Sequence, residues 1–506
     1  MKGKYLLGFD AGTSGSKGTI TDIEGRVIAT AERTHTLISP APGFAEHDPM
    51  IHWEQEFIGI TSELLSKAGA SSDELAGIGI STVMAGIVFC DENYNPLRNA
   101  ILYGIDTRCV AQAEELTEKI GKETMLERFG TVHTVDHYGP KILWVRENEP
   151  EIFEKTKHIT IESGFLTARL TGNNMVSKYS ASAGIPMVDP KTGDWSDDFC
   201  GLVCDRALLP EIAPSADTLC GTVTAKAAKE FGLTEGTPVV VGATDAGAEA
   251  VSVGVVKPGD MMLMYGSTAF MIALTDFAKN GRRLDEIPYV LKGVNAKTAG
   301  MATTGSLTGW IRNVMAKDLL NREEAGEANA YQLLFKEAEG IPVGSDGIVV
   351  LPYFQGERMP ILDPAAKGVL FGLGLQHTRG HIVHAAFEGI GYGIDQNLAL
   401  FKESGFDPGT VTAVGGGTKT RLWLQTVSDI CGISQKVPEV TVGASYGDAL
   451  FAGLAVGAIA SPDDINNIVK IKYTTEPDAA NFEKYREYKE IYRELYERSK
   501  DLMHRL

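Results

Sequence analysis

A short polar segment near the N-terminus carries groups that could bind phosphate. Asp10 closes an apolar run and is followed by a turn with Gly12, Thr13 and Ser14, and then by Lys17. Backbone N–H groups and hydroxyls in such a turn can bind phosphate oxygens, and the lysine can neutralise their charge. Asp10 could hold Mg²⁺ through water, because Mg²⁺ keeps several waters and takes few carboxylates. The alternative interpretation is a plain hairpin with polar turn residues.

A second carboxylate stands among small residues in the middle of the chain. Asp245 lies in the segment Gly-Ala-Thr-Asp-Ala-Gly of residues 242–247, directly after the apolar run 238–241. Small neighbours let a ligand approach the backbone closely, and a carboxylate there can accept a proton from a substrate hydroxyl. Alternatively, Asp245 caps a helix that begins at Ala246, as aspartate often does. The local pattern leaves both interpretations open.

Three glycine turns follow apolar runs in the second half of the chain. Each leaves a strand end without a bulky side chain, which suits the close approach of a nucleotide, although each could be an ordinary turn. The candidate nucleotide-binding residues in these turns are Gly266 and Ser267, Gly305, and Gly416 and Gly417.

Strands and helices must bring these groups together. The residues 5–9, 19–22 and 26–29 are short apolar runs separated by glycine turns, which predicts strands. A helical pattern from Trp53 to Lys67 precedes another predicted strand at 78–81. Continued alternation of strands and helices indicates an α/β fold.

The length of 506 residues is too great for one ordinary core. A second cycle of strand-like runs begins near the middle, so we expect an N-terminal domain over 1–248 and a C-terminal domain over 249–470. A helical tail over 471–506 completes the prediction. Its aromatic and apolar residues recur every three or four positions, which favours a helix packed on the body over a partner-binding module. These residues are Phe482, Tyr485, Tyr488, Tyr492 and Leu495.

Composition narrows the class of protein. Hydrophobic residues make up 43% and charged residues 22%, as in ordinary soluble enzymes. The formal net charge of −19 disfavours nucleic acid and anionic membranes as partners. It would also repel ATP, so a nucleotide enzyme here needs Mg²⁺ and local backbone donors.

The chain lacks the signals of export. No window approaches the roughly 20 apolar residues of a membrane span, and the N-terminal apolar run is too short for a signal peptide. Six scattered cysteines suit reduced thiols in the cytoplasm. Cys200 and Cys204 have no second pair, so no zinc site is expected. We therefore expect a cytoplasmic protein without nucleic-acid or membrane partners.

The order of these motifs carries a resemblance over nearly the whole chain. It resembles the FGGY family of carbohydrate kinases, close to the xylulose kinase branch. Besides the Asp10 turn, the similar segments are 43–49 with Trp53, 99–108 with Asp106 and Arg108, 351–358 with Pro360, Asp363, Pro364 and Gly368, and 415–417 with Trp423 and Gln425.

The resemblance implies two domains of the actin and hexokinase type (ribonuclease H-like), with a catalytic cleft between them. It implies that Asp245 is the general base, with Asp10 and Asp245 near Mg²⁺. Thr13, Ser14 and Lys17 would lie near the phosphates of ATP. Ser267, Gly305, Gly417 and Arg421 would lie along the nucleotide in the C-terminal domain, and the family suggests a homodimer.

One departure affects the sugar. Xylulose kinases usually carry Met-His where this chain has Met84 and Ala85. The loss of an imidazole removes a partner for a sugar hydroxyl. His133 or His137 could replace it, although a surface position is the favoured interpretation of both. We expect Met84, Ala85, Asp106, Arg108 and Asp245 to bind the sugar.

Several alternatives stay open. Asp106 and Arg108 could instead form a surface ion pair at the start of a helix. The substrate could be gluconate, ribulose, glycerol or erythritol in place of a ketopentose. A sugar sensor without activity and an actin- or chaperone-like ATPase are further alternatives on the same fold.

Overall fold

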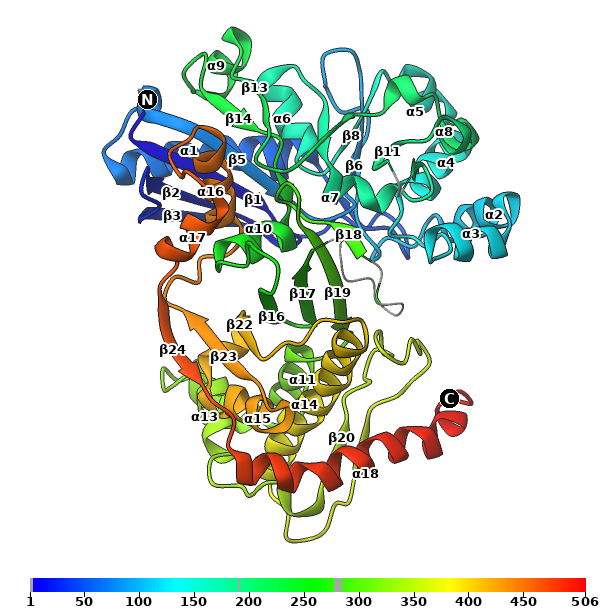
Figure 1. The fold of residues 1–506 in the computed structure, drawn as a ribbon, viewed down its shortest axis with the longest axis vertical. Coiled ribbons are helices and arrows are strands. Elements are labelled where there is room, and N and C mark those ends of the chain that lie inside the picture. The colour runs from blue at the N-terminus through cyan, green and yellow to red at the C-terminus, as the bar shows by residue number, and fades with distance from the viewer. Residues whose placement is uncertain (1–2, 190–191, 277–283, 285) are drawn as a thin grey trace. The chain divides into compact units, whose positions relative to one another are not determined.

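The computed structural model describes residues 3–189, 192–276, 284 and 286–506. The chain folds into two compact units, each built from three segments (Figure 1). The first unit contains Met1–Val256, Ile287–Val294 and Val442–Val469. The second contains Lys257–Glu286, Asn295–Thr441 and Lys470–Leu506. This division differs from the expected linear one, because Val442–Val469 and Ile287–Val294 pack in the first unit and the 471–506 tail packs in the second.

The first unit is organised around a seven-stranded sheet with strand order β13-β14-β5-β1-β2-β3, and β15 extends it beside β5. Strands β1 and β5 lie at its centre and are buried along nearly their whole length, as their unbroken apolar and small residues predict. The strands are β1 (Tyr5–Ala11), β2 (Gly15–Asp22), β3 (Val27–Thr34), β5 (Leu75–Thr82), β13 (Leu219–Thr222), β14 (Pro238–Val240) and β15 (Ala243–Thr244).

Helix α16 (Ala444–Ala455) reaches this sheet from a late part of the chain. It packs on β1 and β5 and contacts α10 (Asp245–Ser252) (Figure 1). Glycines permit this close contact: a Cβ on Gly8 would lie 1.9 Å from the Ser445 carbonyl oxygen, and one on Gly79 would lie 1.9 Å from that of Asp448. The packing of the first unit is therefore completed by a helix that follows most of the second unit in the sequence.

Smaller elements complete the first unit. Its second sheet has the order β4-β7-β6-β8, and short strand pairs and helices surround it. The strands are β4 (Glu46–His47), β6 (Ile87–Cys90), β7 (Ala100–Ile101), β8 (His158–Ile161), β9 (Met175–Ser177), β10 (Val188–Asp189), β11 (Asp194–Trp195) and β12 (Glu211–Ala213). The helices are α1 (Glu56–Ala68), α2 (Val110–Ile120), α3 (Lys122–Phe129), α4 (Tyr138–Asn148), α5 (Pro150–Lys155), α6 (Gly164–Thr171), α7 (Lys178–Ala181), α8 (Asp197–Val203), α9 (Ala225–Phe231) and α17 (Pro462–Ile468).

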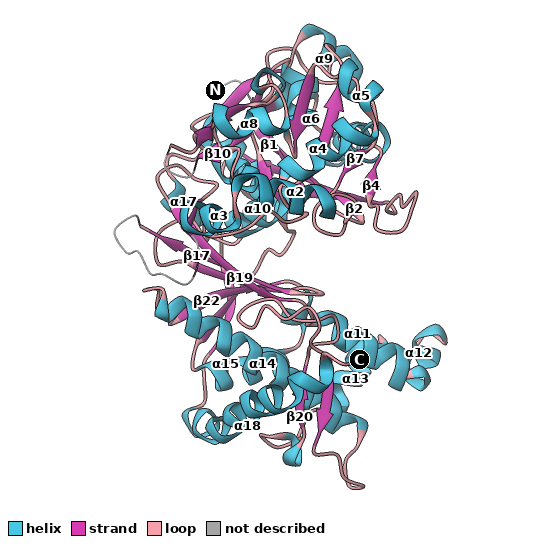
Figure 2. Ribbon diagram, turned by 90° about the vertical axis from the view of Figure 1, so that its right-hand side faces the viewer, coloured by secondary structure: helices cyan, strands magenta, loops and turns pink. Residues whose placement is uncertain are grey.

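The second unit also has a seven-stranded sheet, of order β18-β19-β17-β16-β22-β23-β24. Figure 2 shows β17, β19 and β22 beside helices α14 and α15. The strands are β16 (Met261–Tyr265), β17 (Ala269–Thr275), β18 (Glu286–Pro288), β19 (Asn295–Met301), β22 (Thr410–Val414), β23 (Ser434–Pro438) and β24 (Ile471–Thr475), with a separate pair β20 (Val349–Leu351) and β21 (Val369–Phe371). The helices are α11 (Gly305–Met315), α12 (Lys317–Glu324), α13 (Ala330–Glu337), α14 (Arg379–Glu403), α15 (Arg421–Cys431) and α18 (Ala479–Met503).

Two helices predicted from the spacing of apolar residues are present in the structure. The expected helix from Trp53 to Lys67 begins earlier, as a π-helical turn at Pro49–Gln55 that continues into α1. The Asp48 side chain accepts hydrogen bonds from the N–H groups of Met50 and Ile51, which starts the turn at Pro49. The helix predicted in the C-terminal tail is present as α18, whose Tyr485 and Tyr492 are each only 1% exposed. The start of the expected helical tail differs, because Ile471–Thr475 forms strand β24 beside β23.

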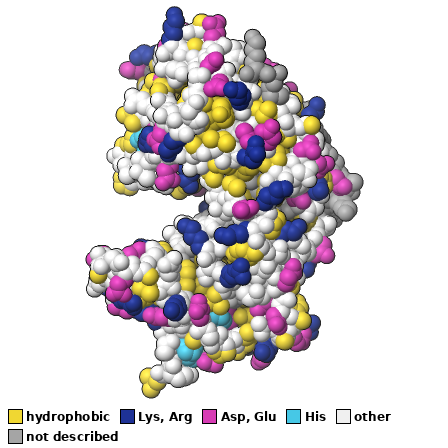
Figure 3. Space-filling model, turned by 90° about the vertical axis from the view of Figure 1, so that its left-hand side faces the viewer, with side chains coloured by type: hydrophobic (Ala, Val, Ile, Leu, Met, Phe, Trp, Pro, Cys, Tyr) yellow, Lys and Arg dark blue, Asp and Glu magenta, His cyan; other side chains and the backbone are white. Residues whose placement is uncertain are grey.

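The surface carries charges of both signs, and the cysteines lie in the interior. Lys and Arg side chains lie among Asp and Glu side chains on the face shown in Figure 3. All six cysteines are buried and none is in a disulfide. Among the described residues, no helix is long and apolar enough to cross a membrane.

Candidate functional site

Three parallel strands of the first unit end at one edge of its sheet. Asp10 of β1 is level with Ser81 of β5, and Ser81 is level with Ala243 of β15. The segments that follow these strands are the Gly12 turn, the Met84–Ala85 segment and helix α10. Ligands of open α/β sheets bind at such a carboxyl edge, so the predicted phosphate, sugar and base residues share one edge.

Asp10 is enclosed by protein and by other carboxylates. It is 9% exposed and accepts a hydrogen bond from the Ser81 hydroxyl at 3.2 Å. Burial, followed by repulsion from Asp245 and Glu249, raises the pKa of Asp10 well above its ordinary value. Lys17 is its direct partner across the β1–β2 ladder and partly offsets this effect.

The turn between β1 and β2 is a tight hairpin with polar side chains on its outside. The Gly12 N–H donates to the Gly15 carbonyl at 3.0 Å. The Thr13 hydroxyl lies 3.3 Å from the Tyr103 hydroxyl, and Ser14 is exposed. The two interpretations of this segment therefore coexist, since a hairpin is present and its polar groups lie at the carboxyl edge.

Asp245 is the first residue of α10 and not its cap. Thr244 caps the helix, because its hydroxyl accepts the Gly247 N–H at 3.2 Å. The capping interpretation of Asp245 is thus wrong: Thr244 already fills that position. One oxygen of Asp245 accepts the Ala246 N–H at 2.8 Å. Burial raises the pKa of Asp245 to about 6, a value suited to a general base near neutral pH.

A left-handed glycine places α10 at this edge. Gly242 has φ +80°, and a Cβ there would lie 2.0 Å from the Ile80 carbonyl oxygen. The chain can therefore turn closely over β5 before it enters β15 and α10. The small residues around Asp245 serve this backbone path as well as ligand access.

Three neighbours of these carboxylates escaped the sequence reasoning. Glu249 lies one helical turn after Asp245, and burial raises its pKa to about 7. Ser81 bridges Asp10 to Asp448 of α16, whose carboxylate oxygen is 2.7 Å from the Ser81 hydroxyl. The i, i+4 spacing could have revealed Glu249, whereas Asp448 is separated from Ser81 by 367 positions and no local pattern links them.

The Met84–Ala85 segment places only one of its side chains at the surface. Met84 is 39% exposed, whereas Ala85 is fully buried with φ +55°. The Ala85 N–H donates to Glu162 at 2.8 Å, and its carbonyl accepts from the Lys141 ammonium at 3.0 Å. This backbone is fixed by two buried charged groups that sequence reasoning did not identify.

Asp106 and Arg108 form an ion pair, but not on the surface. Both side chains are fully buried, and their closest atoms are 2.7 Å apart. Asp106 also accepts the Ala45 N–H at 2.7 Å, and Arg108 also pairs with Glu46 at 2.8 Å. The surface interpretation is wrong, because the guanidinium is covered by the ring of Phe44 at 4.0 Å. Their enclosed geometry holds the 43–46 segment in place.

Of the two candidate histidines, His133 is buried and His137 is partly exposed. His133 is 7% exposed, and its ring nitrogen Nδ1 lies 3.3 Å from the Thr117 hydroxyl. The Nδ1 of His137 accepts the Thr134 N–H at 2.9 Å. Burial lowers the pKa of each to about 4, so both rings are neutral at pH 7. The expected surface position is wrong for His133, which is enclosed beside Thr117, whereas His137 keeps part of its surface exposed.

The second unit contains a cavity of about 910 Å³. It is lined by all six residues predicted there for nucleotide binding, namely Gly266, Ser267, Gly305, Gly416, Gly417 and Arg421. Two of the glycine turns are joined directly, since the Gly305 N–H donates to the Gly266 carbonyl at 2.9 Å. Turns separated in sequence thus form one wall.

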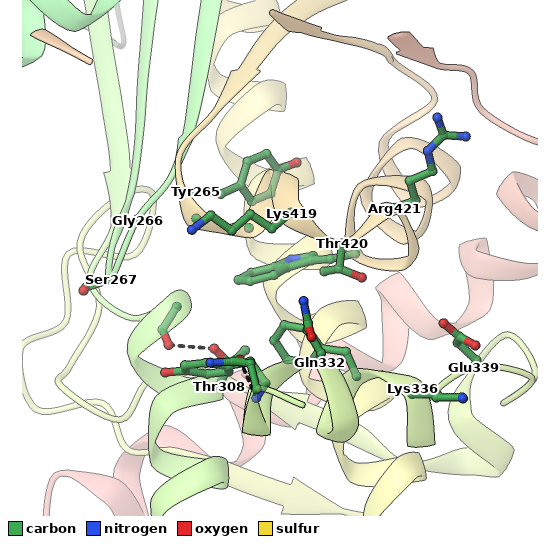
Figure 4. A pocket seen from close by; sticks show the side chains of 17 residues that line it. Tyr265, Gly266, Ser267, Thr308, Gln332, Lys336, Glu339, Lys419, Thr420 and Arg421 are labelled. Atoms are coloured by element: carbon green, nitrogen blue, oxygen red, sulfur yellow. Dashed lines mark hydrogen bonds between the residues drawn. The ribbon is translucent and has the colours of Figure 1, made fainter. Parts of the chain in front are cut away.

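Helix α13 forms another wall that the sequence did not reveal. In Figure 4 the Gln332 side chain points from α13 toward Thr420. Arg421 points away from both, with its guanidinium 4.5 Å from the centre of the Tyr473 ring. The cavity therefore offers polar groups from α13, and Arg421 is held at its margin.

The segment 351–358 supports this cavity from behind. The Glu357 carboxylate accepts the N–H groups of Ala302 and Arg358, each at 2.7 Å. Ala302 leads directly into the turn that contains Gly305. Burial raises the pKa of Glu357 to about 7. This signature segment thus has a structural role in shaping the turn.

Comparison with known proteins gives the family. The description "FGGY family of carbohydrate kinases, N-terminal domain" matches residues 5–252, and the C-terminal domain of the same family matches residues 261–456. The chain belongs to the FGGY family of carbohydrate kinases. It is therefore a sugar kinase that takes ATP as its phosphate donor.

Relatives of this kinase match it from end to end. A xylulose kinase of Bacillus subtilis is 29% identical over 511 residues, covering 99% of this chain and 98% of its own. The crystal structure of xylulose kinase from Rhodospirillum rubrum has a TM-score of 0.89 at 29% identity, covering 99% of this chain and 100% of its own. A Plasmodium falciparum glycerol kinase with ADP has the same fold, with a TM-score of 0.84 at 22% identity, covering 96% of this chain and 97% of its own. The expected two-domain fold of the actin and hexokinase type is confirmed.

The donors around Asp10 suit a cation that keeps most of its own water. Within the described ranges, no three His, Cys, Asp or Glu side chains form a group that could hold a metal ion. Yet burial and the repulsion from Asp245 and Glu249 leave Asp10 in need of positive charge. Mg²⁺ fits such a set, because it binds through one or two carboxylates together with substrate phosphates.

Proposed function

We propose that this carbohydrate kinase transfers the γ-phosphoryl group of ATP to a hydroxyl of a small ketose or polyol, with D-xylulose as the first candidate. The observation that carries the proposal is Asp245, a carboxylate released from capping by Thr244 and set at the same sheet edge as the Gly12 turn. The end-to-end match to proteins named xylulose kinase supports the choice of sugar.

In this mechanism Asp245 accepts the proton of the attacking hydroxyl. Its raised pKa of about 6 brings its basicity closer to neutral pH while it stays mostly ionised at pH 7. The position of Asp245 at the start of α10 also places the carboxylate in the favourable field of the helix N-terminus. The Asp245 carboxylate therefore stays charged at neutral pH and can accept a proton.

The phosphate groups are bound by the turn of the first unit. Thr13 and Ser14 offer hydroxyls and backbone N–H groups, and Lys17 offers a cation beside them. Mg²⁺, when bound, would neutralise charge on the phosphates, and Asp10 would hold it, with Asp245 nearby. Asp10 needs the neighbouring Ser81 hydroxyl to keep its carboxylate oriented.

The adenosine end of the nucleotide occupies the cavity of the second unit. The glycines of its wall let the ligand approach the backbone, and Gln332 supplies a polar group opposite Thr420. The cavity of about 910 Å³ lies within the size range of nucleotide-sized ligand sites. Arg421 acts at the margin, against Tyr473.

A different small polyol is the second candidate substrate. Ala85 is buried and has no hydroxyl partner to offer, unlike the histidine of the xylulose kinase pattern. Met84 is left as the exposed side chain of that segment, while Asp106 and Arg108 are fully buried and hold the 43–46 segment. A glycerol kinase of Thermotoga maritima is 28% identical over 96% of this chain. This similarity supports a polyol such as glycerol as the second candidate.

A coupled assay of ADP release tests the proposal. Ketopentoses, gluconate, glycerol and erythritol are compared at equal concentration with a control that lacks sugar. We expect sugar-dependent ADP release that is greatest with a ketopentose. Release that no sugar increases would refute the kinase mechanism, and a preference for glycerol would replace the ketopentose. The homodimer and the cytoplasmic location stay predictions, which sedimentation and fractionation can test.

A further inference from the structure

Three carbonyl groups of the phosphate turn are bound from the inside of the protein. The His35 ring nitrogen Nε2 lies 3.1 Å from the Gly12 carbonyl oxygen. The His47 nitrogen Nε2 lies 3.1 Å from the carbonyl of Thr13. The His35 main-chain N–H donates to the carbonyl of Ser14, also at 3.1 Å. Two histidines therefore fix three successive peptide groups.

These contacts determine where the N–H groups of the turn point. In a planar trans peptide the carbonyl of one residue and the N–H of the next point in opposite directions. Because the carbonyls of Gly12 and Thr13 point toward the histidines, the N–H groups of Thr13 and Ser14 point away from them. Neither N–H donates to any residue within the described ranges. Two adjacent free N–H groups are thus available to donate hydrogen bonds to an anion.

The partners of each ring define its protonation. His47 Nδ1 accepts the Trp53 indole N–H at 3.2 Å, so its proton is on Nε2, which can donate to Thr13. Burial, then the neighbouring His35 and His52, lowers the pKa of His47 to about 4, so this ring stays neutral. The Trp53 contact thus selects the tautomer that the turn requires.

His35 differs because both of its nitrogens face oxygen. Its Nδ1 lies 3.0 Å from Glu56, while its Nε2 faces the Gly12 carbonyl. Only a ring with two N–H groups satisfies both acceptors. Burial tends to raise the pKa of Glu56, but hydrogen bonds from His35 and Ser16 hold it below its usual value. The neighbouring His52 stacks on this ring with centres 4.6 Å apart.

We infer that His35 and His47 are positioning residues for the triphosphate: they hold the Gly12 and Thr13 carbonyls inward so that the N–H groups of Thr13 and Ser14 face the phosphates. The contact of the other His35 nitrogen with Glu56 fixes the orientation of its ring. This inference rests on the proposed function, since it assumes that the turn binds the phosphates of ATP.

The test compares two nucleotides by titration calorimetry without sugar. A non-hydrolysable ATP analogue with Mg²⁺ probes the turn, while AMP serves as the ligand without β- and γ-phosphates. The variants are His35→Leu, His47→Leu and His35→Gln, whose amide can still donate to Gly12. His384→Gln is the matched control, a buried histidine of the second unit bonded to Ser345 at 3.0 Å.

We expect His35→Leu and His47→Leu to weaken binding of the analogue about tenfold or more relative to AMP, because the Gly12 and Thr13 carbonyls lose the ring N–H groups that orient them. His35→Gln should recover most of the affinity, and His384→Gln should leave the ratio unchanged. Leucine variants with the wild-type ratio would overturn the inference, as would equal loss for both ligands. If His47→Leu does not fold, the two His35 variants decide the result.

The same titration separates this inference from the proposed function. A wild-type protein that binds the analogue more tightly than AMP but phosphorylates no sugar would refute the proposed function alone. A wild-type protein that binds both ligands equally would refute the phosphate role of the turn, and with it the inference.

Discussion

The surroundings of Asp245 determine the pKa of its carboxylate and should therefore set the pH range of activity. Burial raises its pKa to about 6, and a general base acts only when deprotonated. We expect kcat/KM for the sugar to be full above this value and to fall about tenfold per pH unit below it. Rates measured from pH 5 to pH 8, with circular dichroism as a control for folding, check this. An acid limb near pH 4 would contradict the role of burial.

Asp245→Asn removes the base and keeps its shape. The asparagine oxygen can still accept the Ala246 N–H, so α10 should begin as before. We expect kcat to fall by about 10²–10⁴, while the affinity for the ATP analogue stays within about twofold. Wild-type turnover by this variant would remove Asp245 from the mechanism.

The location of a reactive group could be predicted where one strand end carries one such group. Asp10 and Asp245 both follow buried apolar runs, and the structure places them at one edge. Local sequence could not show that Asp106 is buried, because its enclosure depends on Phe44, Glu46 and Arg108 together. Roles for these residues in binding stay predictions.

The position of α16 on the sheet should be sensitive to a single added methyl group. A Cβ on Gly79 would lie 1.9 Å from the Asp448 carbonyl oxygen, so Gly79→Ala should push α16 away from β5. We expect the free energy of unfolding to fall. We also expect kcat to fall, because Asp448 of α16 contacts the Ser81 hydroxyl that binds Asp10. Chemical unfolding and the ADP assay measure both effects.

Gly59→Ala is the matched control for that substitution. Gly59 lies within α1, and a Cβ added there would have nothing within 4 Å. Alanine should stabilise this helix by about 0.5–1 kcal/mol without changing kcat. A Gly79→Ala protein as stable as the wild type would show that α16 tolerates the shift.

The buried ion pair of the 99–108 segment should matter more to stability than to chemistry. Asp106→Ala leaves the Arg108 guanidinium buried and without its closest partner. Removal of one member of such a pair costs about 3–5 kcal/mol. Glu74→Gln, which breaks the exposed Lys4 pair, should leave unfolding unchanged. A large increase in sugar KM with wild-type stability would instead favour direct binding of the sugar.

The elements were predictable where period and length agree. The apolar face of α18 and the unbroken run of β16 indicated their elements directly. The π-helical turn at Pro49–Gln55 could not be predicted, because its hydrogen-bond pattern is set by the Asp48 cap and by tertiary packing around Trp53.

At the scale of the whole molecule, neither unit is a continuous piece of chain. Residues 1–256 lack α16, which covers β1 and β5 in the full protein. We expect this fragment to unfold without cooperativity and to be cleaved rapidly by protease, unlike the full chain. Addition of Val442–Val469 through a flexible linker should restore a cooperative transition. A fragment 1–256 with a sharp transition of its own would contradict this dependence.

The linear domain boundaries illustrate the limit of a pattern read along the chain. A second cycle of strand-like runs is visible from the middle of the chain, and the first segment of the first unit does end at Val256. The return of Val442–Val469 depends on the match between α16 and the glycines of β1 and β5, which are hundreds of positions away. Complementarity between surfaces, and not local propensity, decides that assignment.

Because α16 follows β1 by more than 400 residues, it can pack on the sheet only late in synthesis. A ribosome adds about 5–20 residues per second, so roughly 20–90 s separate the emergence of β1 from that of α16. Throughout this interval the face of β1 and β5 that packs against α16 has no such helix, whereas the opposite face can already pack against residues of α1 and α6. Until residues 444–455 have been synthesised, this face of the sheet is therefore exposed to chaperones and to neighbouring chains.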